Sequence, residues 1–324
     1  MAQLSFSDFE KNLQTKKSRK AEFLEILDRL VPWSSLIALI SPYYPKEPTG
    51  SGRRPYPLES MLRIYLMQLC YSLSDPMMEN ELIDSMSMRK FAHLGGLDNP
   101  TPDETTILNF RHLLERHSLC GEVFDLFNQH LIAAGLRISR GTIIDATIIE
   151  APCSIKNAKK ERDPEAKHTK KGNQYHFGIK AHVGVDADSG IVHSMAVTGA
   201  NVADITMADE LICDDDDTVF ADAGYQGLEK HEKTKDKAVF VALRPGKRKT
   251  LAKDSFLSRF EHLKSQIRAK VEHPFHWLKC VFGLKKLRYR GLHKNAQMLY
   301  AMFGLINLCK NKEILLKLGV CCAQ

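Results

Sequence analysis

The spacing of apolar residues changes at about residue 142, and this change restricts the folds open to the chain more than any other feature. Before it, apolar residues recur at the three- and four-residue spacing of amphipathic helices, as in 58–73. After it, they follow strand-like patterns, beginning with TIIDATII at 142–149. The sequence therefore predicts an all-helical N-terminal module followed by an α/β domain.

The order of elements after residue 142 indicates the type of sheet. Strands are expected at 142–149, 176–186, 191–199, 218–222 and 238–244, with helices at 201–212 and 227–236. The second and third strands meet at the tight turn DADSG, so the sheet is expected to be mixed. Three strands followed by alternating helices and strands is the order of a ribonuclease-H-like fold with flanking helices. The polar, basic segment 151–174 is expected to be a mobile loop.

The helical part contains one strong start signal, in the segment TPDETTILNFRHLLERH at 101–117. Thr101 is expected as the N-cap, Pro102 at the first helical position and Glu104 as the partner in a capping box. Several short helices separated by turns favour a helix-turn-helix-like module in which Arg111 faces a DNA groove. A module that serves packing alone is the alternative.

Two aspartates occupy strand positions that are hard to explain structurally. Alternation puts Asp145 on the same strand face as Ile143 and Ile149, where a carboxylate costs several kcal/mol unless it is paired. A divalent cation is one such partner, and hydrogen bonds from the backbone are the alternative. Asp222 ends a second strand before a glycine-containing turn, at the sheet edge where ligands of open α/β folds bind. The two strands are adjacent in the proposed order, so the two aspartates can share a metal.

A third acid, Glu272, lies in the most basic part of the chain. Residues 244–294 hold 15 Lys and Arg and three acids, a net charge of +12, so the remainder carries −5 of the total +7. Interleaved aromatic residues favour a surface that binds a phosphate backbone over a merely solvated basic face. Arg268 and Lys279 are expected on the same helix face as Glu272, with a kink or restart at Pro274.

The other acidic residues have ordinary explanations. The run from Asp214 to Asp217 is more conspicuous, but consecutive side chains rarely converge on one ion, so a solvated loop is expected. Asp186, Asp188 and Asp204 are assigned to turns and a helix start.

Several classes of protein are disfavoured. No apolar segment reaches the roughly 18 residues that a membrane-spanning helix needs, so a cytoplasmic protein without membrane contact is expected. The absence of a GxxxxGK[ST] loop argues against a nucleotide cofactor. The eight cysteines include no C-x-x-C pair, which argues against a zinc ribbon or a disulfide framework.

Six segments follow one another along the chain from about Pro57: PLESMLRIYLMQLCYSLSD, GTIIDATIIEAP, KKGNQYHFGIKAHVGVDADSG, VFADAGYQG, RPGKR and IRAKVEHPFHWLK. The series resembles the DDE transposases of prokaryotic insertion sequences, in particular the insertion-sequence-five group of the insertion-sequence-four-like class. The resemblance implies Asp145, Asp222 and Glu272 as the catalytic triad and as ligands of two Mg²⁺ or Mn²⁺ ions. These residues are called the three acids below.

The family's Tyr-x2-Arg-x3-Glu-x6-Lys signature implies DNA contacts by Arg268 and Lys279. Ser265 stands at the tyrosine position, a departure that affects an accessory DNA contact and no metal ligand. DNA contacts are also expected from Lys180 and His182, on the strand beside Asp145, and from a further tyrosine in the AGYQG turn, Tyr225.

The resemblance implies a transposase that cleaves double-stranded DNA at terminal inverted repeats and transfers the strand into target DNA. A homodimer in the synaptic complex and a cytoplasmic, nucleoid-associated location follow from that activity. A DDE-type nuclease that does not join DNA, or a domesticated DNA-binding protein, is the alternative.

The expected organisation has four parts: an N-terminal helical segment and linker at 1–50, the helix-turn-helix-like DNA-binding module at 51–136, the ribonuclease-H-like DDE catalytic domain at 137–294 and a C-terminal helix at 295–324.

Overall fold

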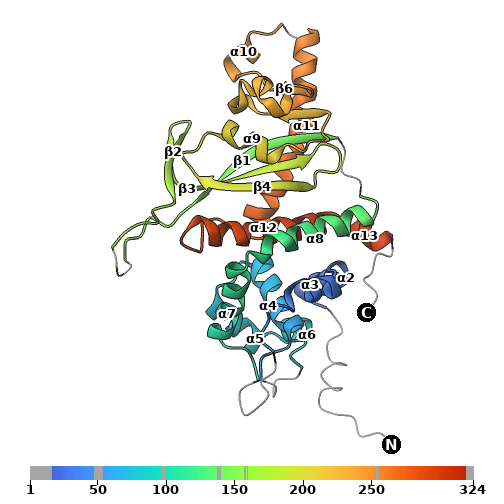
Figure 1. Ribbon diagram of the computed structural model, residues 1–324, viewed down its shortest axis with the longest axis vertical. Helices are drawn as coiled ribbons and strands as arrows, with labels where there is room; N and C mark the ends of the chain where they lie inside the picture. The colour runs from blue at the N-terminus through green and yellow to red at the C-terminus, as the bar shows by residue number, and fades with distance from the viewer. Residues whose placement is uncertain are drawn as a thin grey trace, which may run out of the picture.

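The computed structural model of the chain contains both predicted parts in the predicted order (Figure 1). It describes residues 17–46, 54–95, 100–136, 140–156, 158, 160–252 and 255–318. A helical N-terminal region is followed by a mixed sheet with flanking helices, which confirms the ribonuclease-H-like fold class.

The N-terminal region consists of short helices joined by turns. They are α2 (Arg19–Leu30), α3 (Trp33–Ile40), α4 (Leu58–Tyr71), α5 (Asp75–Asp84), α6 (Met86–Phe91), α7 (Glu104–Arg116) and α8 (Leu119–Ala133). The part of the expected N-terminal helical segment before residue 17 lies outside the described residues. Helix α4 is buried from Ser60 to Cys70, so its neighbours pack around it.

Helix α7 starts later than the sequence pattern predicts. Asp103 is its N-cap, and its Oδ1 accepts a hydrogen bond from the Thr106 N–H at 2.7 Å. The hydroxyl of Thr101 instead accepts a bond from Arg89 Nη1 at 2.7 Å. The expected capping box is therefore wrong, because Thr101 serves a tertiary contact and the next acidic residue takes the cap.

The sheet has six strands: β1 (Gly141–Glu150), β2 (Lys167–Lys171), β3 (Gln174–Asp186), β4 (Val192–Gly199), β5 (Thr218–Ala221) and β6 (Ala238–Val241). The strand order is β2-β3-β1-β5-β6, with β4 also paired to β3. Strand β1 runs antiparallel to β3 and parallel to β5, so it is the central strand. The first half of β3 pairs with β2 and the second half with β4.

The connections differ from the predicted ones in two places. The expected helix at 201–212 is the short pair η1 (Asp204–Met207) and α9 (Ala208–Leu211), and 227–236 holds only the 3-10 turns η3 (Leu228–Lys230) and η4 (Glu232–Thr234). The segment expected to be a mobile loop contains β2, which pairs with β3 over five residues. Its sequence, KHTKK, has no apolar face, and the hydrogen bonds to β3 make it a strand.

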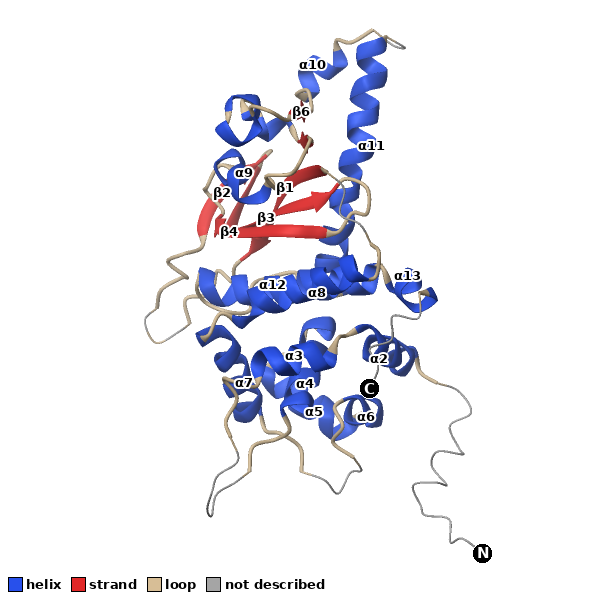
Figure 2. Ribbon diagram, turned by 45° about the vertical axis from the view of Figure 1, so that its right-hand side comes forward, coloured by secondary structure: helices blue, strands red, loops and turns tan. Residues whose placement is uncertain are grey.

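After a short helix α10 (Pro245–Lys249), the chain forms four elements: α11 (Phe256–His276), the π-helical turn η5 (Trp277–Val281), α12 (Leu292–Lys310) and α13 (Lys312–Lys317). Helix α12 lies beside α8, and the two form a layer between the sheet and the other N-terminal helices (Figures 1 and 2). One hydrophobic core continues through all three layers. The helical region and the sheet are thus packed on each other.

Two buried residues of α12 fix this layer against the sheet. The Asn307 side chain accepts a hydrogen bond from the Val192 N–H at 3.0 Å and donates to the Val192 carbonyl at 2.8 Å, so it pairs with the start of β4 as a strand would. It also donates to Asn128 of α8 at 2.8 Å. A Cβ at Gly304 would lie 2.5 Å from the Phe127 ring, so glycine is what permits the close approach of α12 and α8.

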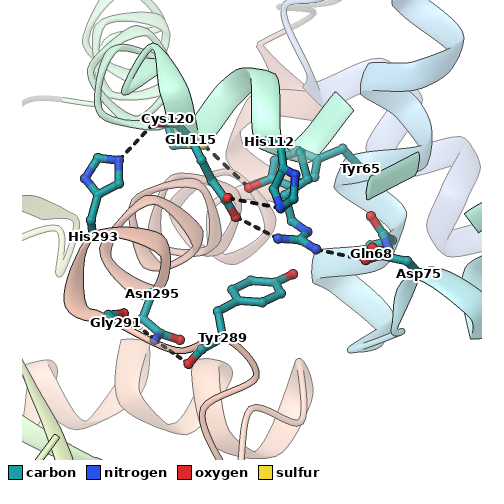
Figure 3. Close-up of polar contacts among 11 residues, drawn as sticks. Tyr65, Gln68, Asp75, His112, Glu115, Cys120, Tyr289, Gly291, His293 and Asn295 are labelled. Atoms are coloured by element: carbon teal, nitrogen blue, oxygen red, sulfur yellow. Dashed lines mark hydrogen bonds and ion pairs between the residues drawn. The ribbon is translucent and has the colours of Figure 1, made fainter. Parts of the chain in front are cut away.

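A buried polar network joins the N-terminal helices to the segment before α12 (Figure 3). Its central residue is Arg111, which contacts both parts. The guanidinium of Arg111 forms ion pairs of 2.8 Å with both Asp75 and Glu115, and it lies 4.1 Å from the centre of the Tyr289 ring. Arg111 is only 6% exposed. This burial corrects the expectation that Arg111 faces a DNA groove, because its polar atoms are directed at partners inside the protein.

Candidate active site

Strand pairing brings two of the three acids to the same level of the sheet. The parallel register of β1 and β5 pairs Ile143 with Phe220 and Ile144 with Ala221, and the next step along both strands reaches Asp145 and Asp222. Paired residues of neighbouring strands point to the same face. The two carboxylates therefore project from adjacent strands where β5 ends.

The Asp145 carboxyl group is in an unfavourable environment for a negative charge. Its side chain is 16% exposed, and its Oδ1 accepts one hydrogen bond, of 2.8 Å, from the Ala146 N–H. Burial raises the pKa of Asp145 to about 7, and the negative charges of Asp222 and Glu272 contribute to the rise against the opposing effects of the Ala146 hydrogen bond and Arg268. The charges of Asp222 and Glu272 are therefore close enough to act on the Asp145 carboxyl group.

Asp222 is held by the turn that follows β5. It caps the 3-10 turn η2 (Ala223–Tyr225), and its Oδ1 accepts a hydrogen bond from the Gly224 N–H at 2.7 Å. A Cβ at Gly224 would lie 2.9 Å from that same oxygen. Glycine at this position leaves the Asp222 carboxylate room to adopt its place at the strand end.

Helix α11 supplies Glu272 and the two cations of the signature. It packs against β1 and β5, and Arg268 Nη2 lies 3.9 Å from Asp145 Oδ2. Lys279, in the π-helical turn, donates to the Ile148 carbonyl of β1 at 2.9 Å. The helix does not restart at Pro274, because α11 continues to His276 and then widens into η5. Arg268 and Lys279 thus both reach β1, on either side of the exposed Glu272 in sequence.

The three acids offer oxygen donors, which are the ligands that Mg²⁺ and Mn²⁺ prefer. Burial raises the pKa of the Asp145 carboxyl group, and a cation at this position would lower it again by stabilising the carboxylate. Within the described residues, however, no group of three or more His, Cys, Asp or Glu side chains is gathered closely enough to hold a metal ion. The residues fit a divalent cation in kind, and their carboxylates would have to draw together around it.

The side chains of Lys180 and His182 are not directed to the face of the sheet on which Asp145 meets Arg268. In the antiparallel register of β1 and β3, Asp145 is paired with Val183, whereas His182 and Lys180 are paired with Ala146 and Ile148. Alternation therefore directs Lys180 and His182 to the opposite face of the sheet. This corrects the expectation that they contact DNA at the active site.

The partners of these two side chains are within the protein. Lys180 Nζ donates to the Val202 carbonyl at 2.7 Å and lies 2.9 Å from Asp204 Oδ1. His182 is completely buried and its Nε2 is 2.8 Å from the Thr198 hydroxyl. Burial lowers the pKa of His182 to about 4, so the ring is neutral at pH 7.

Tyr225 is also completely buried, which corrects the expectation that it contacts DNA. Burial raises its pKa, and the charges of Asp204, Asp145 and Asp222 add to the rise. Asp204 is the acid that sequence reasoning assigned only to a helix start. Asp204 does begin η1, but it also lies near Asp222. A Cβ built on Gly224 would be 3.8 Å from Asp204 Oδ2 and 2.9 Å from Asp222 Oδ1. Only the pairing of distant segments reveals this proximity.

None of the three acids lines the open pocket at the far end of α11. This pocket, of about 390 Å³, lies between α10 and the start of α11, where Arg248, Arg259 and His262 contribute to its lining. Glu261, also in that lining, precedes Glu272 by eleven residues, or about 16 Å along the helix. Asp145 and Asp222 instead lie at the level where β5 ends, beside the helix α11 that carries Glu272.

Comparison with known families agrees with this geometry. The family model described as the transposase DDE domain matches residues 137–308, which is more than half of the chain. The chain belongs to the DDE transposase family. A second model, described as a transposase domain of the DUF772 type, matches residues 11–113. No solved structure matches the chain.

Membership gives the chain the general function of its family, which is DNA transposition, and DNA as its partner. The family uses divalent metals. None of the described helices is both long enough and apolar enough to cross a membrane.

Proposed function

We propose that this protein cleaves DNA at the terminal inverted repeats of an insertion sequence and joins the freed end to target DNA, as a member of the insertion-sequence-five group. Asp145, Asp222 and Glu272 are the catalytic acids and would hold two Mg²⁺ or Mn²⁺ ions. The observation that carries the proposal is the β1–β5 register, which places Asp145 and Asp222 at one level beside the helix that bears Glu272.

The three acids have different positions and therefore different constraints. Asp145 is fixed by a central strand and Asp222 by the cap of η2, so both carboxylates are held by rigid backbone. Glu272 is exposed on α11, and its side chain is free to turn toward the other two. Bound divalent cations would activate water or a 3′-hydroxyl and stabilise the charge that develops on the scissile phosphate.

The cations of the signature position the DNA strand. Arg268 Nη2 lies beside Asp145, and the Nη N–H groups that are not directed at the carboxylate can donate to a phosphate oxygen. Lys279 is anchored by the Ile148 carbonyl three residues further along β1. The DNA backbone is therefore proposed to run along β1 from Arg268, beside Asp145, to Lys279, beside Ile148.

The helical region is proposed to bind the terminal repeats, as a helix-turn-helix-like module within residues 51–136. Two DNA ends must be brought together for joining, so the functional form is proposed to be a homodimer.

A strand-transfer assay tests the proposal. The full chain is incubated with Mg²⁺, a labelled duplex that carries the inverted repeat flanking the coding sequence, and a supercoiled target plasmid. The expected result is a nick at the repeat end followed by covalent joining of the labelled strand to the plasmid. Joining should require a free 3′-hydroxyl, so a pre-cleaved duplex whose repeat end carries a 3′-dideoxy nucleotide serves as the control.

The alternatives give different products in the same assay. A DDE-type nuclease would yield the cleaved end without labelled plasmid, and a domesticated DNA-binding protein would yield a gel shift without cleavage. Either result would overturn the transposase proposal, and the three acids would keep their assigned role only in the first case.

A further inference from the structure

A row of cations, beginning with the half-buried Lys279, leads away from the three acids along one side of β1. Strand β5 pairs with β1 only as far as Ile144, and beyond that point the segment after α11 runs beside β1 instead. Lys279 donates to the Ile148 carbonyl, and the Leu287 N–H donates to the Glu150 carbonyl at 2.8 Å. This segment places the exposed Lys285 and Lys286 beside the end of β1.

The row continues onto the hairpin of β2 and β3. Lys170 and Lys171 are both exposed at the end of β2, next to the turn at Gly172. Lys171 is near enough to Lys279 that its charge, after burial, lowers the pKa of Lys279. Alternation turns Lys170 and Lys171 to opposite faces of the hairpin, so together with the residues beside β1 they surround the end of the sheet where β1 stops. This group is called here the basic edge: Lys170, Lys171, Lys279, Lys285 and Lys286.

The basic edge ends at an aromatic side chain. Tyr175, at the start of β3, is 74% exposed, and the Lys170 ammonium group lies 5.5 Å from the centre of its ring. Its neighbour Phe177 instead packs against the core. A solvated tyrosine next to lysines on a protruding hairpin suits stacking on a nucleic-acid base, since every base has an aromatic face.

We propose that the basic edge binds the DNA strand that leads away from the catalytic acids, and that Tyr175 stacks on an unpaired base of that DNA. The proposal rests on the function proposed above and assigns the binding path beyond Arg268 and Lys279. Charge complementarity with the phosphate backbone identifies the occupant as DNA.

The register sets the length of the path. Five residue steps separate Asp145 from Glu150, which pairs with Gly178, and Tyr175 lies three residues further along β3. At about 3.3 Å per residue, these eight steps span roughly 26 Å. That distance corresponds to about eight base pairs at about 3.4 Å per base pair.

Binding measurements test the basic edge without cleavage. The full chain is titrated by fluorescence anisotropy into a labelled 30-base-pair duplex of mixed sequence, blunt or with a three-nucleotide single-stranded tail. Lys171→Gln is expected to weaken binding to both about threefold to tenfold and to reduce the slope of log affinity against log salt by about one. Lys317→Gln is the matched control, because Lys317 is exposed on α13, on the opposite side of the molecule from β2 (Figure 1).

The tailed duplex tests the aromatic contact. Tyr175→Ala is expected to weaken binding of the tailed duplex about fivefold to tenfold, and Tyr175→Phe, which keeps the ring, is expected to bind as the wild type does. Both positions are exposed, so the variants should fold, and circular dichroism verifies this. Wild-type affinity and salt dependence of Lys171→Gln together with wild-type binding by Tyr175→Ala would overturn the proposal.

The two proposals fail separately. If strand transfer is absent, the binding results still decide whether the basic edge holds DNA. If the variants bind as the wild type does while the wild type joins DNA, the basic edge is excluded and the proposed function stands. Shortening the cleavage substrate on either side adds a third readout, because Tyr175→Ala should cease to matter below about eight base pairs on the side that the edge binds.

Discussion

Arg268 Nη2 lies 3.9 Å from Asp145 Oδ2, and this contact joins the basic helix α11 to the acidic centre of the sheet. It connects residues 123 positions apart in the chain, and it sets Glu272, one helical turn after Arg268, toward the same region. The separation is longer than that of a tight ion pair, so Arg268 keeps N–H groups for a phosphate while it partly offsets the charge of the buried carboxyl group.

Removal of Arg268 should slow the chemical step more than it weakens DNA binding. At saturating DNA, Arg268→Ala is expected to lower the cleavage rate about 100-fold to 1,000-fold, because a donor next to the reacting phosphate is lost. The cleavage rate of Arg268→Lys should lie between those of Arg268→Ala and the wild type, since an ammonium group keeps the charge without the planar fork of the guanidinium. Arg259→Ala is the control, because Arg259 is an exposed residue of the same helix. An equal loss of cleavage rate in Arg259→Ala would show that the overall positive charge of the helix matters and the contact with Asp145 does not.

Gly224 is predicted to be essential for activity rather than for stability. The Cβ of Gly224→Ala would lie 2.9 Å from Asp222 Oδ1 and displace the carboxylate, with a loss of cleavage on the order of 100-fold. Gly224 is exposed, so the melting temperature should remain within a few degrees. Gly246→Ala is a matched control because nothing lies within 4 Å of its added Cβ. Normal cleavage by Gly224→Ala would show that the Asp222 position tolerates displacement.

Asn307 is predicted to stabilise the fold by pairing with the start of β4. Asn307→Ala removes the acceptor of the buried Val192 N–H and the donor to its carbonyl, so the free energy of unfolding should fall by about 2 to 3 kcal/mol. Asn109→Ala, at an exposed position of α7, should change it by less than about 0.5 kcal/mol. Urea unfolding followed by circular dichroism measures both, and similar values for the two variants would contradict the account.

His182 should make the fold sensitive to acid. Its pKa is about 4 in the folded chain, mainly because of burial, against an ordinary value of 6.5. The unfolded chain therefore binds the extra proton first, and stability that is present above pH 6.5 is lost as the pH falls toward 4. The loss attributable to this side chain is on the order of 3 kcal/mol.

The comparison that isolates His182 is with His182→Gln, whose amide can keep a hydrogen bond to Thr198. The free energy of unfolding of the wild type, measured by urea titration from pH 7 to pH 4, should fall more steeply than that of the variant. The charges facing the ring are Asp204, which opposes the shift, and Lys180, which adds to it. Parallel curves for the two proteins would show that the ring is not held neutral.

The strands with an apolar face could be predicted from sequence, and the polar one could not. Strands β1 and β3 follow the expected runs closely because Ile, Val and Ala cover their buried positions. Strand β2 has five residues that are mostly exposed, so only its hydrogen bonds to β3 define it, and hydrogen bonds leave no trace in residue spacing. The short 3-10 turns after β4 and β5 likewise depend on packing against the sheet and not on helical periodicity.

The candidate site shows the same division. The positions of Asp145 and Asp222 on adjacent strands followed from the element order, and their common level required only parallel pairing. The face of Lys180 and His182 depended on the register of β3 against β1, in which one step reverses every side chain. Arg111 resembled a surface base on a short helix, and the partners that bury it, Asp75 and Tyr289, come from distant segments.

The central claim is that Asp145, Asp222 and Glu272 form one metal-dependent active site, and cleavage by isosteric variants tests it most directly. Asp145→Asn, Asp222→Asn and Glu272→Gln are compared with Asp214→Asn, a variant in the exposed acidic run, on the inverted-repeat duplex with Mg²⁺ or Mn²⁺. Each of the first three variants is expected to cleave at least about 1,000-fold more slowly than the wild type and to bind DNA as the wild type does. Asp214→Asn is expected to cleave normally. Wild-type cleavage by any one of the three would remove that residue from the site and contradict the account.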